Sequence, residues 1–272
     1  MMVNRYNNSK NGSLDANVYV QIEPIKNLRF KTVYGISYGA SEYRAYTPKY
    51  QFTPQTANTV SKVNQSHGHG LSMVWTNTLS YDFNIATEHH INALIGSELS
   101  TYDGSNTEGS NTGLIPGFDD WDHAYLVNTN GTENKTVKGS PYDSTRGMSY
   151  FARLGWTWKE RYMVNATMRA DGSSKFAKGN RWGYFPSVSA GWTISEEKFM
   201  ESVKSWFDFL KIRVSWGQVG NANINCYQYL APVSTTNTNY NFGSGGGQDA
   251  WVTGSYTSRL ANEKVKWETS EQ

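Results

Sequence analysis

The chain has 272 residues, with 25 basic and 23 acidic side chains and a formal net charge of +2. This near-neutral balance excludes the strongly basic surface by which nucleic-acid-binding proteins hold phosphates. Aromatic residues make up 14% of the chain, with 10 Trp and 18 Tyr, which is typical of a β protein whose rings lie at an interface or line a binding surface.

The cysteine count and the two chain ends add further limits. The single cysteine, Cys226, excludes an intrachain disulfide and a cysteine-based metal site. No apolar run approaches the roughly 20 residues of a transmembrane helix. The first five residues lack the apolar core of a signal peptide, and the last five fall within a strand-like pattern. We therefore expect residues 1–272 to be a segment of a longer exported protein.

Apolar and polar residues alternate with a period of two in successive segments, which predicts about nine β-strands. These segments lie at residues 14–22, 28–38, 69–83, 89–102, 150–158, 162–171, 187–194, 210–216 and from about 263 onward. After Ile194, residues 195–200 predict a short helix with Ser195 as its N-cap.

The connections between these strands alternate between short and long. Tight turns are predicted at residues 25–27, 84–87 and 159–161, whereas 39–67, 103–147 and 218–262 are long polar loops. Antiparallel barrels of the outer membrane have short periplasmic turns and long extracellular loops, and a β-sandwich does not sort its loops in this way. The pattern predicts an all-β, up-and-down transmembrane barrel segment, an incomplete barrel whose tight turns are periplasmic.

The strand pair at residues 162–192 separates two kinds of side chain. A transmembrane barrel places its apolar face in lipid and its polar face in the lumen. The residues expected to face lipid are Val164, Ala166, Met168, Val188, Ala190 and Trp192. The residues expected to face the lumen are Asn165, Thr167, Arg169, Ser187, Ser189 and Gly191.

The same strand pair carries the motifs by which the chain resembles a known family. The motifs are RADGSSKF (169–176), WGYFPSVSAGW (182–192), SYFARL (149–154), LKIRVSWG (210–217) followed by Gly220-Asn221, and KWE (266–268). In this order and spacing they resemble the barrel of SusC/RagA TonB-linked outer-membrane transporters over roughly the whole chain. The matching signature residues are Arg169, Asp171, Gly172, Ser173, Ser174, Phe185, Pro186, Trp216 and Gly217.

The resemblance implies a function. Members of the family are gated pores of the Gram-negative outer membrane that import oligosaccharides or peptides. A plug inside the barrel is pulled by the TonB complex, and a SusD-like lipoprotein covers the outer mouth. No plug is recognisable in this chain, so the resemblance implies barrel wall and outer loops in contact with membrane lipid.

Several residues are candidates for contact with a substrate. Trp121, Tyr125 and Trp251 lie in predicted outer loops, where they either stack on a ligand or pack a loop against the barrel rim. Arg153, Arg169, Lys211 and Arg213 are expected on the lumen face, where they either pair with acidic groups or contact a plug or an anionic substrate. Six further aromatic residues are expected in interface girdles, namely Trp156, Trp158, Tyr162, Trp182, Tyr184 and Trp192.

Two groups of metal-ligating residue types also occur. His67 and His69 would share a strand face, but an obvious third ligand is missing, which favours histidines at an aqueous interface. Asp119, Asp120 and Asp122 lack the spacing of a calcium-binding hand, which favours a solvated acidic loop. We expect no metal site and no cofactor.

No catalytic motif is recognisable, so we expect a protein that is not an enzyme. A soluble or surface-anchored β-sandwich that binds glycans is the alternative, since strand alternation and aromatic residues also fit it. A secreted β-rich hydrolase would need a pair of carboxylates across a cleft, which the sequence does not place.

Overall fold

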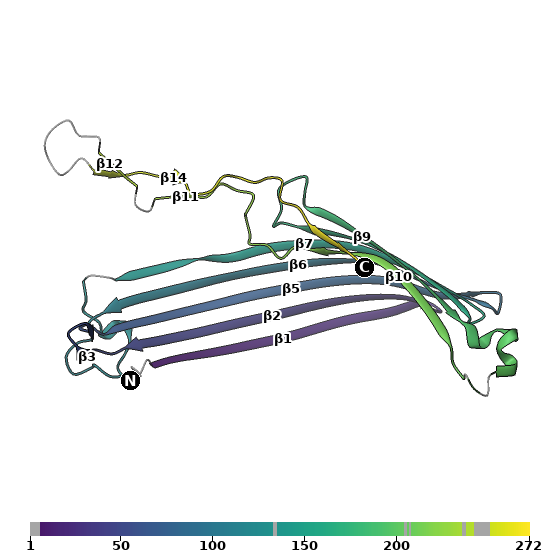
Figure 1. Ribbon diagram of the computed structural model, residues 1–272, viewed down its shortest axis with the longest axis horizontal. Helices are drawn as coiled ribbons and strands as arrows, with labels where there is room; N and C mark the ends of the chain where they lie inside the picture. Colours follow the sequence, from purple (N-terminus) through teal and green to yellow (C-terminus); the bar gives the residue numbers. More distant parts are fainter. Residues whose placement is uncertain (1–5, 133–134, 204–205, 207, 236–237, 242–250) are drawn as a thin grey trace. The chain divides into compact units, whose positions relative to one another are not determined.

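The computed structural model describes residues 6–132, 135–203, 206, 208–235, 238–241 and 251–272. Nine strands form one sheet in the order β1-β2-β5-β6-β7-β8-β9-β10-β15, which confirms the predicted number and the pairing of sequential neighbours (Figure 1). They are β1 (Tyr6–Ile25), β2 (Leu28–Thr47), β5 (Lys62–Ile85), β6 (His89–Thr112), β7 (Thr136–Trp158), β8 (Tyr162–Ser173), β9 (Trp182–Thr193), β10 (Lys211–Asn221) and β15 (Glu268–Glu271).

Two compact units divide the chain, and the long strands contribute to both. Unit 1 comprises the residues up to Val20 together with 32–76 and 99–144, and unit 2 comprises 21–31, 77–98 and 145–272. Unit 2 holds the three tight turns together with the β8–β9, β9–β10 and β10–β15 connections, and unit 1 holds the β2–β5 and β6–β7 connections. Among the residues that the structure describes, no helix is long and apolar enough to cross a lipid bilayer.

The three tight turns of unit 2 lie where they were predicted. In the β7–β8 turn two successive residues, Lys159 and Glu160, have positive φ angles of 53° and 55°. Positive φ at two successive residues matches the right-handed twist of the strands that the turn joins. The N–H of Lys159 donates to the carbonyl of Glu88 at 2.8 Å, so neighbouring turns are hydrogen-bonded to each other.

The register of β7, β8, β9 and β10 fixes which side chains share a face. Ala166 lies opposite Leu154 on β7 and Val188 on β9, and Thr167 lies opposite Arg153 and Ser187. Val214 on β10 lies opposite Ala190. Because directly paired residues point to the same side of a sheet, the two predicted sets of side chains occupy opposite faces.

The strands of unit 1 are longer than predicted. The stretches 39–47, 62–67, 103–112 and 136–147, which were expected to be loop, continue β2, β5, β6 and β7. These stretches are polar on both sides, and therefore lack the alternation that marks a strand with one apolar face. The connections that remain contain the hairpin of β3 (Tyr50–Thr53) and β4 (Thr56–Asn58) and the 3₁₀ helix η1 (Leu126–Asn128).

Two further predictions in unit 2 need correction. The predicted helix at 195–200 is a pair of 3₁₀ turns, η2 (Ile194–Glu196) and η3 (Lys198–Val203), and Ser195 lies buried inside η2 instead of capping it. The predicted last strand, from about 263, begins at Glu268. Between β10 and β15 lie two small hairpins, β11 (Val233–Ser234) with β14 (Tyr256–Thr257), and β12 (Asn239–Asn241) with β13 (Trp251–Thr253).

A small aromatic cluster joins three of the sequence motifs in unit 2. Phe176 is fully buried and Phe185 is 8% exposed. The ring of Trp267 lies 5.3 Å from Phe176 and 5.5 Å from Phe185, measured between centroids. A Cβ atom at Gly220 would overlap the ring of Phe185. The cluster therefore explains why the chain has glycine at this position of β10.

Replacing Gly220 with alanine should lower the free energy of unfolding of the full-length protein by about 1–3 kcal/mol, because overpacking forces neighbouring atoms to move. Gly12→Ala is the matched control, since a Cβ there meets no atom within 4 Å. Reversible unfolding in liposomes measures both. An effect of Gly220→Ala no larger than that of Gly12→Ala would contradict the packing described for Phe185.

Candidate functional site

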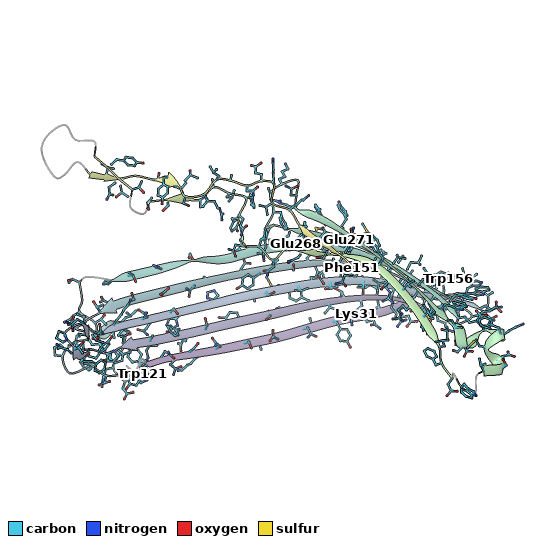
Figure 2. All side chains as sticks on the ribbon, in the orientation of Figure 1. Lys31, Trp121, Phe151, Trp156, Glu268 and Glu271 are labelled. Atoms are coloured by element: carbon cyan, nitrogen blue, oxygen red, sulfur yellow. The ribbon has the colours of Figure 1, made fainter. Side chains whose placement is uncertain are left out.

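Unit 2 carries aromatic side chains in two rows on its apolar face. The row beside the tight turns includes Trp158, whose ring centroid lies 5.4 Å from that of Tyr162, which in turn lies 6.2 Å from Trp192. Trp156, which is labelled in Figure 2, belongs to the same row. Its indole donates to Nδ1 of His89 at 3.1 Å. In the second row, Tyr150 and Trp182 stack with centroids 6.1 Å apart.

The spacing of the two rows matches the thickness of a membrane. On β8, Tyr162 belongs to the first row, and Gly172, ten positions further on, is paired with Trp182 of the second row. Ten positions correspond to about 34 Å along a strand. A tilt of about 40° reduces this to roughly 26 Å, close to the apolar band of about 25 Å on outer-membrane barrels.

The side chains between the two rows are apolar and uncovered. The exposed fraction is 46% for Val188 and 64% for Val214. The other exposed members are Leu154, Val164, Met168 and Ile212. A contiguous exposed apolar surface marks a site that contacts lipid or protein.

The opposite face of unit 2 is polar and carries the four predicted cations. The register places Arg153 opposite Thr167, Lys211 opposite Thr193, and Arg213 opposite Gly191. Arg153 and Arg213 are exposed. The Lys211 ammonium lies 3.0 Å from the sulfur of Met163.

Arg169 differs from the other cations because it is paired with acidic groups. Its Nε lies 2.7 Å from Oδ1 of Asp171, and one terminal nitrogen lies 3.5 Å from Oε1 of Glu98. The guanidinium also lies over the ring of Phe151, 5.4 Å from its centroid. Of the two alternatives for this residue, the described contacts favour charge pairing on the polar face.

The remaining signature residues lie in the loop between β8 and β9 or within the paired strands β8, β9 and β10. Ser173 donates its N–H to the carbonyl of Arg181, and the Ser174 hydroxyl accepts from the N–H of Arg146 at 2.9 Å. Pro186 and Trp216 lie on the apolar face, opposite Met168 and Val188. Gly172 pairs with Trp182, and Gly217 pairs with Ser187 on the polar face. These residues shape the wall and its outer edge.

Trp121 packs a loop onto the strands of unit 1. The guanidinium of Arg44 lies 3.9 Å from the ring centroid of Trp121 and 4.1 Å from that of Tyr125. Arg44 also donates to the carbonyl of Trp121 at 3.2 Å. Of the two alternatives for Trp121, these contacts favour loop packing, whereas Tyr125 remains 41% exposed. Trp251 begins β13, and its side chain lies outside the described residues.

Beneath Trp121 lies the small core of unit 1. Its buried residues are Tyr46, Val63, Leu114 and Ala124. The Tyr46 hydroxyl donates to the carbonyl of Asp119 at 2.9 Å. Burial, reinforced by Asp119, raises the pKa of Tyr46 to about 12, so this phenol stays protonated at neutral pH. The loop is therefore anchored to the strands by packing and by hydrogen bonds from Tyr46 and Arg44.

The acidic and histidine clusters do not converge. Asp119 pairs with Lys49 at 2.8 Å, and Asp120 pairs with His123 at 2.9 Å. The histidine holds the pKa of the Asp120 carboxyl below its usual range. His67 lies 3.7 Å from Glu42. Within the described part of the chain, no three His, Cys, Asp or Glu side chains come together as a metal site would require.

Glu197, which the sequence analysis did not single out, connects η2 and η3 to the first aromatic row. Its carboxylate accepts from the Tyr162 hydroxyl at 2.5 Å and from the indole of Trp192 at 3.1 Å, and it lies 3.4 Å from Arg161. The hydrogen bond from Tyr162, followed by that from Trp192, holds the pKa of Glu197 below its usual value. The two rings and the carboxylate come from three separate segments, and therefore no local pattern marks them.

An antiparallel sheet with sequential neighbours, tight turns at one end and an uncovered apolar band between aromatic rows defines the wall of an outer-membrane type of β-barrel. The sequence profile described as TonB dependent receptor-like, beta-barrel matches residues 3–272. The chain belongs to this family, whose members are transporters of the outer membrane of Gram-negative-type bacteria.

Particular relatives refine the comparison. TonB-dependent receptor P26 of Formosa agariphila is 32% identical over 197 residues, which cover 71% of this chain and 18% of the relative. TonB-dependent receptor SusC of Bacteroides thetaiotaomicron is 42% identical over 124 residues, which cover 44% of this chain and 12% of the relative.

A solved structure supports the fold. The RagAB peptide importer in its closed-closed state matches with a TM-score of 0.80 and 25% identity, and the match covers 98% of this chain and 28% of that chain. These similarities confirm the SusC/RagA resemblance. The chain spans less than a third of the length of each of these relatives.

Protonating Glu197 should weaken its contacts with the aromatic row. Because its folded-state pKa lies below the ordinary 4.5, its contribution to stability is fully present above that value and disappears as the pH falls through the folded-state pKa. We expect Glu197→Gln to unfold more easily than the unmodified protein near neutral pH, and the difference to shrink below about pH 4.5. Unfolding in liposomes at several pH values measures it. A difference that stays constant down to pH 3 would contradict this role.

Proposed function

We propose that this chain forms part of the wall and outer mouth of a TonB-dependent transporter in the Gram-negative outer membrane. The observation that carries the proposal is the apolar band between the two aromatic rows of unit 2. Lipid solvates such a band, whereas water does not, and aromatic rings are favoured at both membrane interfaces. The soluble β-sandwich alternative requires a second sheet over this face, and the described strands form one nine-stranded sheet and three small hairpins.

The segments of β5 and β6 that belong to unit 2 have the length of a membrane crossing. A tilted strand crosses a bilayer with about 9–11 residues. β5 and β6 each have 24 residues, of which 77–85 and 89–98 belong to unit 2. In this proposal the apolar band of unit 2 lies in the bilayer and its tight turns lie in the periplasm. The polar strand ends at 39–47, 62–67, 103–112 and 136–147 are in contact with water.

The polar face of unit 2 lines the lumen in this account. A wet lumen solvates Arg153 and Arg213, whereas lipid would not. Charge pairing of Arg169 with Asp171 keeps that cation on the wall. We propose that Arg153, Lys211 and Arg213 contact the plug or an anionic part of the substrate.

The cargo and the partners follow from the relatives. RagAB is described as a peptide importer, and the SusC/RagA resemblance implies import of oligosaccharides or peptides. We propose that this chain serves the same class of cargo, with energy from the TonB complex and a SusD-like lipoprotein at the outer mouth.

A charge on either face tests the assignment of lipid and lumen. Ala166→Arg should destabilise the full-length receptor by about 2–4 kcal/mol near the middle of the membrane, because lipid cannot solvate the guanidinium. Thr167→Arg should cost much less, because its side chain enters water. The two positions are adjacent on β8 and form a matched pair. Reversible unfolding in liposomes measures both. A larger loss of stability for Thr167→Arg would show that the two faces are reversed. Equal losses would show that neither face contacts lipid.

A second test concerns the loop aromatics. We propose that Tyr125 and Trp251 contact substrate, and that Trp121 acts mainly by fixing the loop. Tyr125→Ala and Trp251→Ala should reduce uptake of the native substrate several-fold at unchanged receptor levels. The reason is that the loss of one aromatic contact costs about 1 kcal/mol of binding free energy. Val127→Ala is the control, since Val127 is 84% exposed on the same loop. Unchanged uptake in both aromatic variants would remove these residues from the account.

A further inference from the structure

The β9–β10 connection is much longer than the three tight turns beside it. The turns at 26–27, 86–88 and 159–161 contain two or three residues, whereas this connection runs from residue 194 to 210. It begins with η2 and η3, which lie at one end of the β9–β10 pair (Figure 1). The N–H of Ile194 donates to the carbonyl of Leu210 at 2.8 Å, so the connection is closed at its base.

Apolar side chains of this connection are exposed. The exposed fraction is 64% for Phe199, 87% for Trp206 and 69% for Phe209. Exposed charged residues, Glu196, Lys198 and Glu201, are interleaved with them. A segment that combines bulky apolar residues with charges is typical of the boundary between lipid headgroups and acyl chains.

Glu197 determines the side on which the connection lies. It hydrogen-bonds to the side chains of Tyr162 and Trp192, and both belong to the turn-side aromatic row of the apolar face. The start of the connection is therefore held at the edge of the surface assigned to lipid, and not over the polar face. The exposed aromatic residues lie further along the same connection, which joins β9 to β10.

We propose that residues 194–203, together with Phe209, form an interfacial anchor that binds the phospholipid surface of the periplasmic leaflet. The occupant is lipid because the anchor is continuous with an aromatic row whose spacing fits a bilayer. Charged groups among its apolar residues suit the headgroup layer better than a dry protein interface. The inference rests on the proposed function, since it requires unit 2 to span the membrane.

Site-specific fluorescence in the full-length receptor tests the anchor. In a Cys226→Ser background, single cysteines at Phe199, Phe209, Lys26 and Val188 are labelled with bimane, and the receptor is reconstituted in phosphatidylcholine vesicles. Phosphatidylcholine spin-labelled near the headgroup quenches labels at the interface, and aqueous iodide quenches labels in water. The heat-modifiable migration of each variant confirms that the barrel is folded.

We expect the labels at 199 and 209 to be quenched by the spin-labelled lipid about threefold or more over the label at Lys26, because an interfacial segment lies roughly 5–10 Å into the boundary. Adding Glu197→Ala should restore iodide quenching at 199. If the labels at 199 and 209 are quenched like the label at Lys26, while the label at Val188 contacts lipid, the anchor is overturned and the proposed function is not. Labels shielded from both quenchers would overturn it in favour of a protein contact. A water-exposed Val188 would overturn the proposed function itself.

Discussion

The register between β7, β8, β9 and β10 is the constraint on which the other features of unit 2 depend. A shift of one residue would move every side chain of a strand to the other face. In the observed register Leu154, Ala166 and Val188 are aligned across three strands, and Arg153, Thr167 and Ser187 are aligned behind them. The backbone groups are paired within the sheet, as a segment surrounded by lipid requires. One apolar and one polar face follow from this alignment.

Different surroundings account for the different chemistry of the two units. In unit 2 the exposed apolar face lies between the two aromatic rows. In unit 1 the strand extensions at 39–47, 62–67, 103–112 and 136–147 lack an apolar face, and the loop around Trp121 completes a small core there. Arg44 holds this loop by stacking on Trp121 and Tyr125 and by hydrogen bonding to the loop backbone. A loop packed on the strand ends in this way can present a fixed surface to a ligand or a partner.

The sequence alone predicted the strand order, the tight turns and the two faces, because a period of two is a local signal that needs no knowledge of the neighbouring strands. The alternation of apolar and polar residues is absent where both faces of a strand are polar. The extensions of β2, β5, β6 and β7 were therefore assigned to loops. The contacts of Glu197 and the packing of Phe176 against Trp267 join segments far apart in the chain. Such contacts depend on folding in three dimensions, so residue type and spacing did not reveal them. The pairing of Arg169 was one of two alternatives that only the structure separated.

The central claim is that one face of β8 meets lipid and the other meets water. The most direct measurement is the accessibility of spin labels placed one at a time at residues 162–171 of the full-length receptor in vesicles. Oxygen collects in lipid, and a nickel chelate stays in water. The account predicts that the ratio of the two accessibilities alternates with a period of two, with lipid contact at Val164, Ala166 and Met168. A ratio without alternation, or lipid contact at Asn165, Thr167 and Arg169, would contradict it.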